Sequence, residues 1–214
     1  MRHTGPVAAE VAGPEPERLS ADERRQALLD VAKAVVNESG PDAVTMGAVA
    51  ERADVTRALV YKHFENKDAL LLELYRREAS ALDRSIRRQV EAADAGFEPK
   101  LRTFVRSCLD AAGEHGQFFA PLRSARTSDD ARRQQRRWDR RTSGYFADLA
   151  AEEFGIDLAT AATAIGVLFS GIQNLLSQMR RSPSADRRDQ LEEVYVEMTI
   201  GALERLASGR TPRA

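Results

Sequence analysis

Residues 45–67, TMGAVAERADVTRALVYKHFENK, contain two short helical patterns separated by a break. In the first pattern Thr45 is a favourable N-cap, and the apolar residues that follow recur at helical spacing. Asp54 and Val55 interrupt this pattern, and Thr56 can cap a second short helix. Two helices joined by a turn of about three to four residues form a helix-turn-helix, whose second helix can lie in the major groove of DNA.

The second helix leaves a polar face outside. Its apolar positions are Leu59, Val60 and Phe64, and no acidic residue occurs between Thr56 and Glu65, although an ordinary solvated face would normally carry one. The other side chains supply groups that proteins use to contact phosphates and base edges. We therefore predict that DNA is bound by Thr45, Thr56, Arg57, Ala58, Tyr61, Lys62, His63 and Lys67. The alternative is a small polar helix on a globular domain.

The order of these residues resembles the tetracycline-repressor (TetR) family of transcriptional regulators. The specific part is the pair Tyr61 and Phe64, followed by Lys67 and a leucine-rich helix. The resemblance covers about residues 20–75. Two residues depart from a simple pattern: Asp54 stands in the turn where the family usually has Gly, and Gly47 lies inside the first short helix.

Neither departure removes the helix-turn-helix prediction. Asp tolerates left-handed backbone better than most non-glycine residues, so we expect the turn at Asp54 to form. Gly47 costs its helix about 1 kcal/mol relative to Ala.

The resemblance implies an all-α fold. An N-terminal three-helix head over residues 20–66 would bind DNA, and a helical domain over residues 67–208 would bind an effector and form the dimer. Residues 1–19, with three prolines, are predicted to be a disordered arm, and residues 209–214 a tail.

Chemistry and resemblance together suggest roles for the predicted DNA-binding residues. Arg57 suits a bidentate pair with guanine O6 and N7. Thr56, Ala58 and Lys62 suit contacts with base edges, methyl groups or nearby phosphates. The remaining positions suit phosphates, because hydroxyls and helix-start amides favour anions, and these positions are Thr45, Tyr61, His63 and Lys67.

Composition limits the other possibilities. The chain has 214 residues, of which 43% are hydrophobic and 30% charged, with a net charge of −1, so it is not a general nucleic-acid-coating protein. Cys108 is the single cysteine, and the three histidines are scattered, so we expect no disulfide, metal or cofactor. No run of about 18 apolar residues and no signal peptide stand out, and we expect no membrane span and a cytoplasmic location.

Helix signals continue along the chain. Ser20 and Glu23 form a capping box for a helix that stops at Gly40. A long helix from Lys67 to near Gly96 links the head to the rest of the chain. The next helix is predicted to have Pro99 in its first position.

The last two helical segments are the most apolar. Residues 157–181 are predicted as one helix and residues 185–208 as the next, which together form a helical hairpin. Such a hairpin with surplus apolar residues suits a two-fold interface. The resemblance to the family favours homodimerisation through residues 157–208, and the alternative is that both helices are internal core.

The resemblance also implies a pocket for a small effector. The candidate lining residues are aromatic or soft, although plain core is the simpler role for each one taken singly: Phe104, Cys108, Phe118, Phe119, Trp138, Tyr145 and Phe169. Few charges fall on these faces, which suggests an apolar or weakly polar effector.

The predicted function is a ligand-responsive transcriptional regulator, most simply a homodimeric repressor of a near-palindromic double-stranded DNA operator, and an activator stays possible. No phosphate-binding loop, metal cluster or nucleophile pairing indicates an enzyme. The alternatives are a helical small-molecule-binding protein, or an interaction module that uses the arginine face from Arg132 to Arg141. That face also suits simple exposure to solvent.

Overall fold

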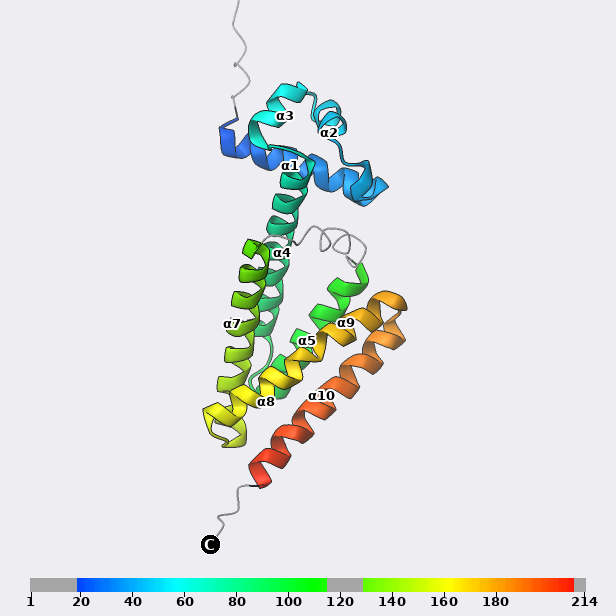
Figure 1. Ribbon diagram of the computed structural model, residues 1–214. Coiled ribbons are helices and arrows are strands. Elements are labelled where there is room, and N and C mark those ends of the chain that lie inside the picture. The colour runs from blue at the N-terminus through cyan, green and yellow to red at the C-terminus, as the bar shows by residue number, and fades with distance from the viewer. Residues whose placement is uncertain (1–18, 115–128, 210–214) are drawn as a thin grey trace, which may run out of the picture.

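The computed structural model describes residues 19–114 and 129–209, without the side chains of residues 114 and 129–139. Every regular element in these residues is a helix, which confirms the all-α prediction (Figure 1). The helices are α1 (Ala21–Ser39), η1 (Pro41–Ala43), α2 (Met46–Arg52), α3 (Arg57–His63), α4 (Lys67–Ala92), α5 (Phe97–Glu114), α7 (Asp129–Phe154), α8 (Leu158–Ser170), α9 (Ile172–Arg181) and α10 (Ala185–Ser208).

Side-chain caps fix where the first helices begin. The amide of Glu23 donates to the Ser20 hydroxyl at 3.2 Å and its carboxylate accepts from the Ser20 amide at 2.8 Å, so the predicted capping box is present. Thr45, Thr56 and Asn66 accept from the third amide of α2, α3 and α4, respectively. These local hydrogen bonds divide residues 45–67 into the predicted short helices.

Apolar residues of the first four helices form the core of the head. Val44, Val49 and Val60 are fully enclosed, and Phe64 is 2% exposed just after α3 ends. α1 crosses beneath α2 and α3 at the top of Figure 1, and α4 descends from the head. The apolar face of α1 thus packs beneath the two short helices.

A second, separate core lies in the C-terminal helices, where α5 packs against α4, α7, α9 and α10. Its centre is aromatic: the rings of Phe97 and Phe146 lie 5.9 Å apart edge to face, and Phe104 stacks on Phe169 at 5.4 Å. α4 supplies residues to both cores, with Leu74 in the head and Val90 in the C-terminal bundle. This helix therefore joins the two parts mechanically.

Two predicted helix boundaries are wrong. α5 begins at Phe97, so Pro99 is its third residue; the Phe97 amide donates to the Glu153 carboxylate of α7 at 2.6 Å, a partner 56 residues away. The long linking helix accordingly ends at Ala92 instead of near Gly96, where a φ of 108° suits glycine alone.

The prediction of one helix over residues 157–181 is also wrong. α8 ends at Ser170 and α9 begins at Ile172, with a turn at Gly171. An added Cβ at Gly171 would lie 3.1 Å from the Leu168 carbonyl oxygen, so glycine permits this tight joint. By length and composition alone Leu158–Arg181 is apolar enough to cross a membrane, with a mean hydropathy of 1.4, although the prediction was that no such segment exists.

Candidate nucleic-acid interface

The turn between α2 and α3 forms as predicted despite the missing glycine. Asp54 has a φ of 51°, in the left-handed region that Asp tolerates. Its amide donates to the Glu51 carbonyl at 3.2 Å, and the Val55 amide donates to the Ala50 carbonyl at 3.0 Å. These bonds close α2 and direct the chain into α3.

α3 presents the predicted polar residues on the outside. Tyr61 is 56% exposed, His63 is half-buried, and the remaining predicted residues of this helix and its cap are exposed, namely Thr56, Arg57, Ala58 and Lys62. Val60 is the buried residue of α3 and Leu59 is half-buried, so the exposed polar positions are the ones that can face a groove. The structure thus brings the predicted set together, and DNA binding by these residues stays a prediction.

The two capping threonines keep a donor for a phosphate. The Thr45 hydroxyl accepts from the Ala48 amide at 3.0 Å, and the Thr56 hydroxyl accepts from the Leu59 amide at 3.3 Å. Because each hydroxyl also carries a proton, it can donate outward while it caps its helix. Structural and DNA-binding roles are therefore compatible at both positions.

Lys67 is the first residue of α4 and is half-buried at the surface of the head. Its ammonium donates to the Asp42 carbonyl oxygen at 3.1 Å, which ties the start of α4 to η1. An ammonium has three N–H donors, so two stay free for a phosphate.

The structure gives a physical reason for glycine at position 47, which the sequence alone did not. A Cβ built there would lie 2.9 Å from Nη2 of Arg57, so the guanidinium of the predicted base reader rests against α2 at the position without a side chain. Spacing along one helix could not reveal this, because the contact joins two helices.

Sequence analysis also missed Arg25 on α1. Its guanidinium donates to the Glu73 carboxylate of α4 and to the His63 carbonyl at the end of α3. The hydrogen bond to Glu73 raises the pKa of Arg25 above its ordinary value. Arg25 therefore keeps its charge in the position where α1, α3 and α4 meet.

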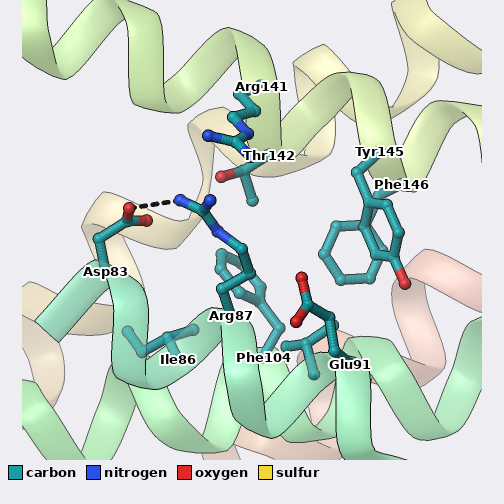
Figure 2. A pocket seen from close by; sticks show the side chains of 10 residues that line it. Asp83, Ile86, Arg87, Glu91, Phe104, Arg141, Thr142, Tyr145 and Phe146 are labelled. Carbon is teal, nitrogen blue, oxygen red and sulfur yellow. Dashed lines mark hydrogen bonds and ion pairs between the residues drawn. The ribbon is translucent and has the colours of Figure 1, made fainter.

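A cavity of about 140 Å³ lies in the C-terminal bundle between α4, α5 and α7 (Figure 2). Of the predicted effector-binding residues it brings together Phe104 and Tyr145. Cys108 and Phe169 belong to the surrounding core, and Phe118, Phe119 and the Trp138 side chain lie outside the described residues.

The lining of this cavity is more charged than predicted. Its floor contains Ile86 and Phe104, whereas Asp83, Arg87, Glu91 and Arg141 also line it. Arg87 donates to Asp83 at 2.6 Å. The prediction from sequence named no residue of α4, so it missed the charged side chains that this helix contributes.

Cys108 is buried, and burial raises the pKa of its thiol to about 12, so it is a core residue and no reactive thiolate at neutral pH. Within the described ranges no group of three or more His, Cys, Asp or Glu side chains could hold a metal ion. The proposed arm, the end of the tail and most of the arginine face lie outside the described residues or side chains.

Large apolar side chains are exposed on the two outer helices of the bundle. On α8 these are Leu158 and Val167, and on α10 Val194, Met198 and Leu206. Val167 is 68% and Met198 65% exposed, whereas each helix buries its opposite side in the bundle core. Large exposed apolar surfaces mark interaction sites in many proteins.

Comparison with known proteins agrees with this geometry. Residues 28–74 match the model of the family described as bacterial regulatory proteins, tetR family. The HTH-type transcriptional repressor KstR of Mycobacterium tuberculosis is 38% identical over 76 residues, which cover 36% of this chain. The matched region spans 34% of KstR, so the chain covers about a third of that relative's length.

Solved structures extend the likeness to nearly the whole fold. A putative transcriptional regulator from Pseudomonas aeruginosa PAO1 has a TM-score of 0.70 and 20% identity over 90% of this chain and 96% of its own. FadR from Bacillus subtilis, in complex with stearoyl-CoA, has a TM-score of 0.60 and 16% identity over 82% of this chain and 97% of its own. The resemblance to the TetR family is confirmed, and the architecture of head plus helical domain with it.

Proposed function

We propose that this chain, a member of the TetR family through residues 28–74, is a homodimeric, ligand-responsive regulator of transcription that binds a near-palindromic DNA operator. The observation that carries the proposal is the outer face of α3. That face is exposed, contains no acid from Arg57 to His63, and follows a properly formed turn from α2. α3 can therefore enter a major groove with Arg57 toward the base edges.

Dimerisation supplies the specificity that one head lacks. A single α3 reaches only a few bases, whereas two heads related by a two-fold axis read successive major grooves about 34–36 Å apart. The exposed apolar residues of α8 and α10 support pairing of these helices with their copies in a four-helix arrangement. The same pairing would cover Leu158–Arg181, whose most apolar 18-residue window is only 17% buried in one chain.

Regulation follows from the position of the cavity. It is lined by α4, which also contributes to the core of the head, so an effector that favours a different α4 position changes the separation of the two heads. A preference of about 1–3 kcal/mol for the non-binding state changes DNA affinity about 5–150-fold. Residues 83–91 and the aromatic floor suit a small effector with an apolar body and a polar group. The FadR complex supports an amphiphilic ligand in this fold.

We propose that the chain represses transcription, because its relative KstR is named a transcriptional repressor. We propose that the chain acts without catalysis, at the chromosome in the cytoplasm.

The test is a selection of DNA sequences by the purified full chain beside an Arg57→Ala variant. We expect wild type to enrich a palindrome whose half-sites lie about one helical turn apart, and the variant to lose about 1–3 kcal/mol of discrimination per half-site. Arg52→Ala is the matched control, because Arg52 pairs with Glu38 at 2.5 Å on the neighbouring helix. Salt-sensitive binding by the wild type without an enriched sequence would contradict the proposal.

A further inference from the structure

We propose that Arg25 is a positioning residue that fixes the DNA-reading helix α3 to the linking helix α4, an inference that rests on the proposed function. The Arg25 side chain is half-buried on α1 and reaches both helices. Nε donates to the Glu73 carboxylate at 2.5 Å, and Nη2 donates to its other oxygen. Nη1 donates to the carbonyl oxygen of His63, the last residue of α3.

The same guanidinium also holds the residue that follows α3. Its carbon lies 4.6 Å from the centroid of the Phe64 ring, which suits a cation–π contact. Phe64 is 2% exposed and belongs to the core of the head. One side chain therefore contacts the last carbonyl of α3, the first side chain after it, and α4.

α3 depends on such a contact because it is short. It has seven residues, buries only Val60 completely, and packs its backbone mainly beside α2. The last carbonyls of a helix have no partner within the helix. Arg25 satisfies the one at His63, and the short segment 64–66 is the only covalent path from α3 to α4.

α1 is in turn fixed to α4 by further ion pairs. Lys33 pairs with Glu78 at 2.6 Å, and Arg77 pairs with Asp30 at 2.9 Å. α1 must therefore follow a displacement of α4. Arg25 would pass that displacement to the end of α3, so that it is not absorbed by the segment 64–66.

Arginine and lysine differ at this position in a way that an experiment can use. The planar guanidinium binds a carboxylate with two parallel N–H groups and still has a donor for a carbonyl. The compact ammonium of lysine cannot reproduce this fork. Arg25→Lys therefore keeps the positive charge near DNA but removes the geometry.

The first measurement is the affinity of full-length variants for the DNA sequence that wild type enriches. We expect Arg25→Lys to bind about tenfold or more weakly, as for the loss of a charge-assisted hydrogen-bond pair. Arg24→Lys is the matched control, since Arg24 is the neighbouring arginine of α1 and is also partly buried. If Arg25→Lys bound as tightly as Arg24→Lys, Arg25 would be a simple positive charge, and the proposal would be wrong.

A double-mutant cycle tests whether Arg25 acts through α4. Glu73→Gln removes the charge of the partner while keeping its shape. The variant that combines Arg25→Lys and Glu73→Gln is expected to bind no more weakly than Arg25→Lys alone, because both changes break the same link. Losses that add in full would show independent roles and overturn the proposal.

Hydrogen exchange of the free full chain separates this proposal from the proposed function. In Arg25→Lys we expect faster exchange of the amides at 60–64 with unchanged exchange in α5 and α10. If wild type enriched no DNA sequence, the proposed function would fail, yet this measurement would still test the link. Unchanged exchange at 60–64, or an equal increase throughout α1–α4, would refute a positioning role.

Discussion

The head and the C-terminal bundle use their apolar residues in opposite ways. In the head most large aliphatic side chains from α1 to α3 are buried, and the outside of α3 is polar. In the bundle, α8 and α10 leave Val167, Val194 and Met198 more than half exposed. A polar outer face suits a hydrated, anionic partner, whereas an apolar one suits a protein surface. We therefore propose different partners for the two regions, which α4 connects.

The largest expected effect comes from making the bundle surface as polar as the head surface. Replacing both Val167 and Met198 by Glu would place carboxylates at the proposed centre of the dimer, where burying unpaired charges costs several kcal/mol. We expect a folded monomer by sedimentation velocity, with operator affinity reduced about a hundredfold or more. Ala81→Glu, at an exposed α4 position, is the control. A double variant that stayed dimeric would place the interface elsewhere.

A smaller effect, on stability, is expected at Glu78 of α4, the helix that joins the two regions. Burial alone would raise the pKa of Glu78, but the hydrogen bonds from Lys33 and Arg77 outweigh it and hold the pKa below its ordinary value. The stabilisation is therefore complete above the unfolded-state pKa and is lost as pH falls through the lower folded-state pKa. Thermal unfolding should show Glu78→Gln less stable than wild type by about 1 kcal/mol at neutral pH.

Wild type and Glu78→Gln should have the same stability in acid, below the folded-state pKa of Glu78. Glu91→Gln, at an exposed position of the same helix, should match wild type at both pH values. A difference between Glu78→Gln and wild type that persisted well below the folded-state pKa would mean that the effect is not electrostatic.

The smallest expected effect is at Gly47 in the head. Ala favours a helix over Gly by about 1 kcal/mol, but a Cβ would displace the Arg57 guanidinium. We expect Gly47→Ala to stabilise the head by less than this while altering the DNA sequence preference. Gly144→Ala in α7, where a Cβ meets nothing within 4 Å, should give the full gain without altered preference. Equal behaviour of both variants in a DNA selection would argue against Gly47 making room for Arg57.

The regions also differ in how much of them could be predicted from sequence. The helix starts in the head depend on bonds across three residues, as at Thr45 and Thr56, so caps and spacing were sufficient. The left-handed turn at Asp54 followed from its own backbone preference. Arg25 was missed because its partners lie 38 and 48 residues away. The cavity was predicted only in part, since its lining comes from three helices and includes the charged face of α4.

Helix boundaries in the bundle were less predictable for the same reason. α5 begins two residues before Pro99 because Glu153 caps Phe97 from another helix. At the break at Gly171, the Tyr195 hydroxyl of α10 donates to the Leu168 carbonyl at 2.9 Å. Contacts from distant residues therefore accompany both boundaries, and the local signals at Pro99 and Gly171 alone were not sufficient to place them.

The central claim is that two heads, set apart by the bundle, read two half-sites together. The most direct test is the affinity of the full chain for its selected operator after five base pairs are inserted between the half-sites. This insertion turns one half-site about half a helical turn away from the other, since a turn takes about 10–10.5 base pairs. We predict that affinity falls to that for an isolated half-site. Unchanged affinity on the lengthened operator would contradict the account.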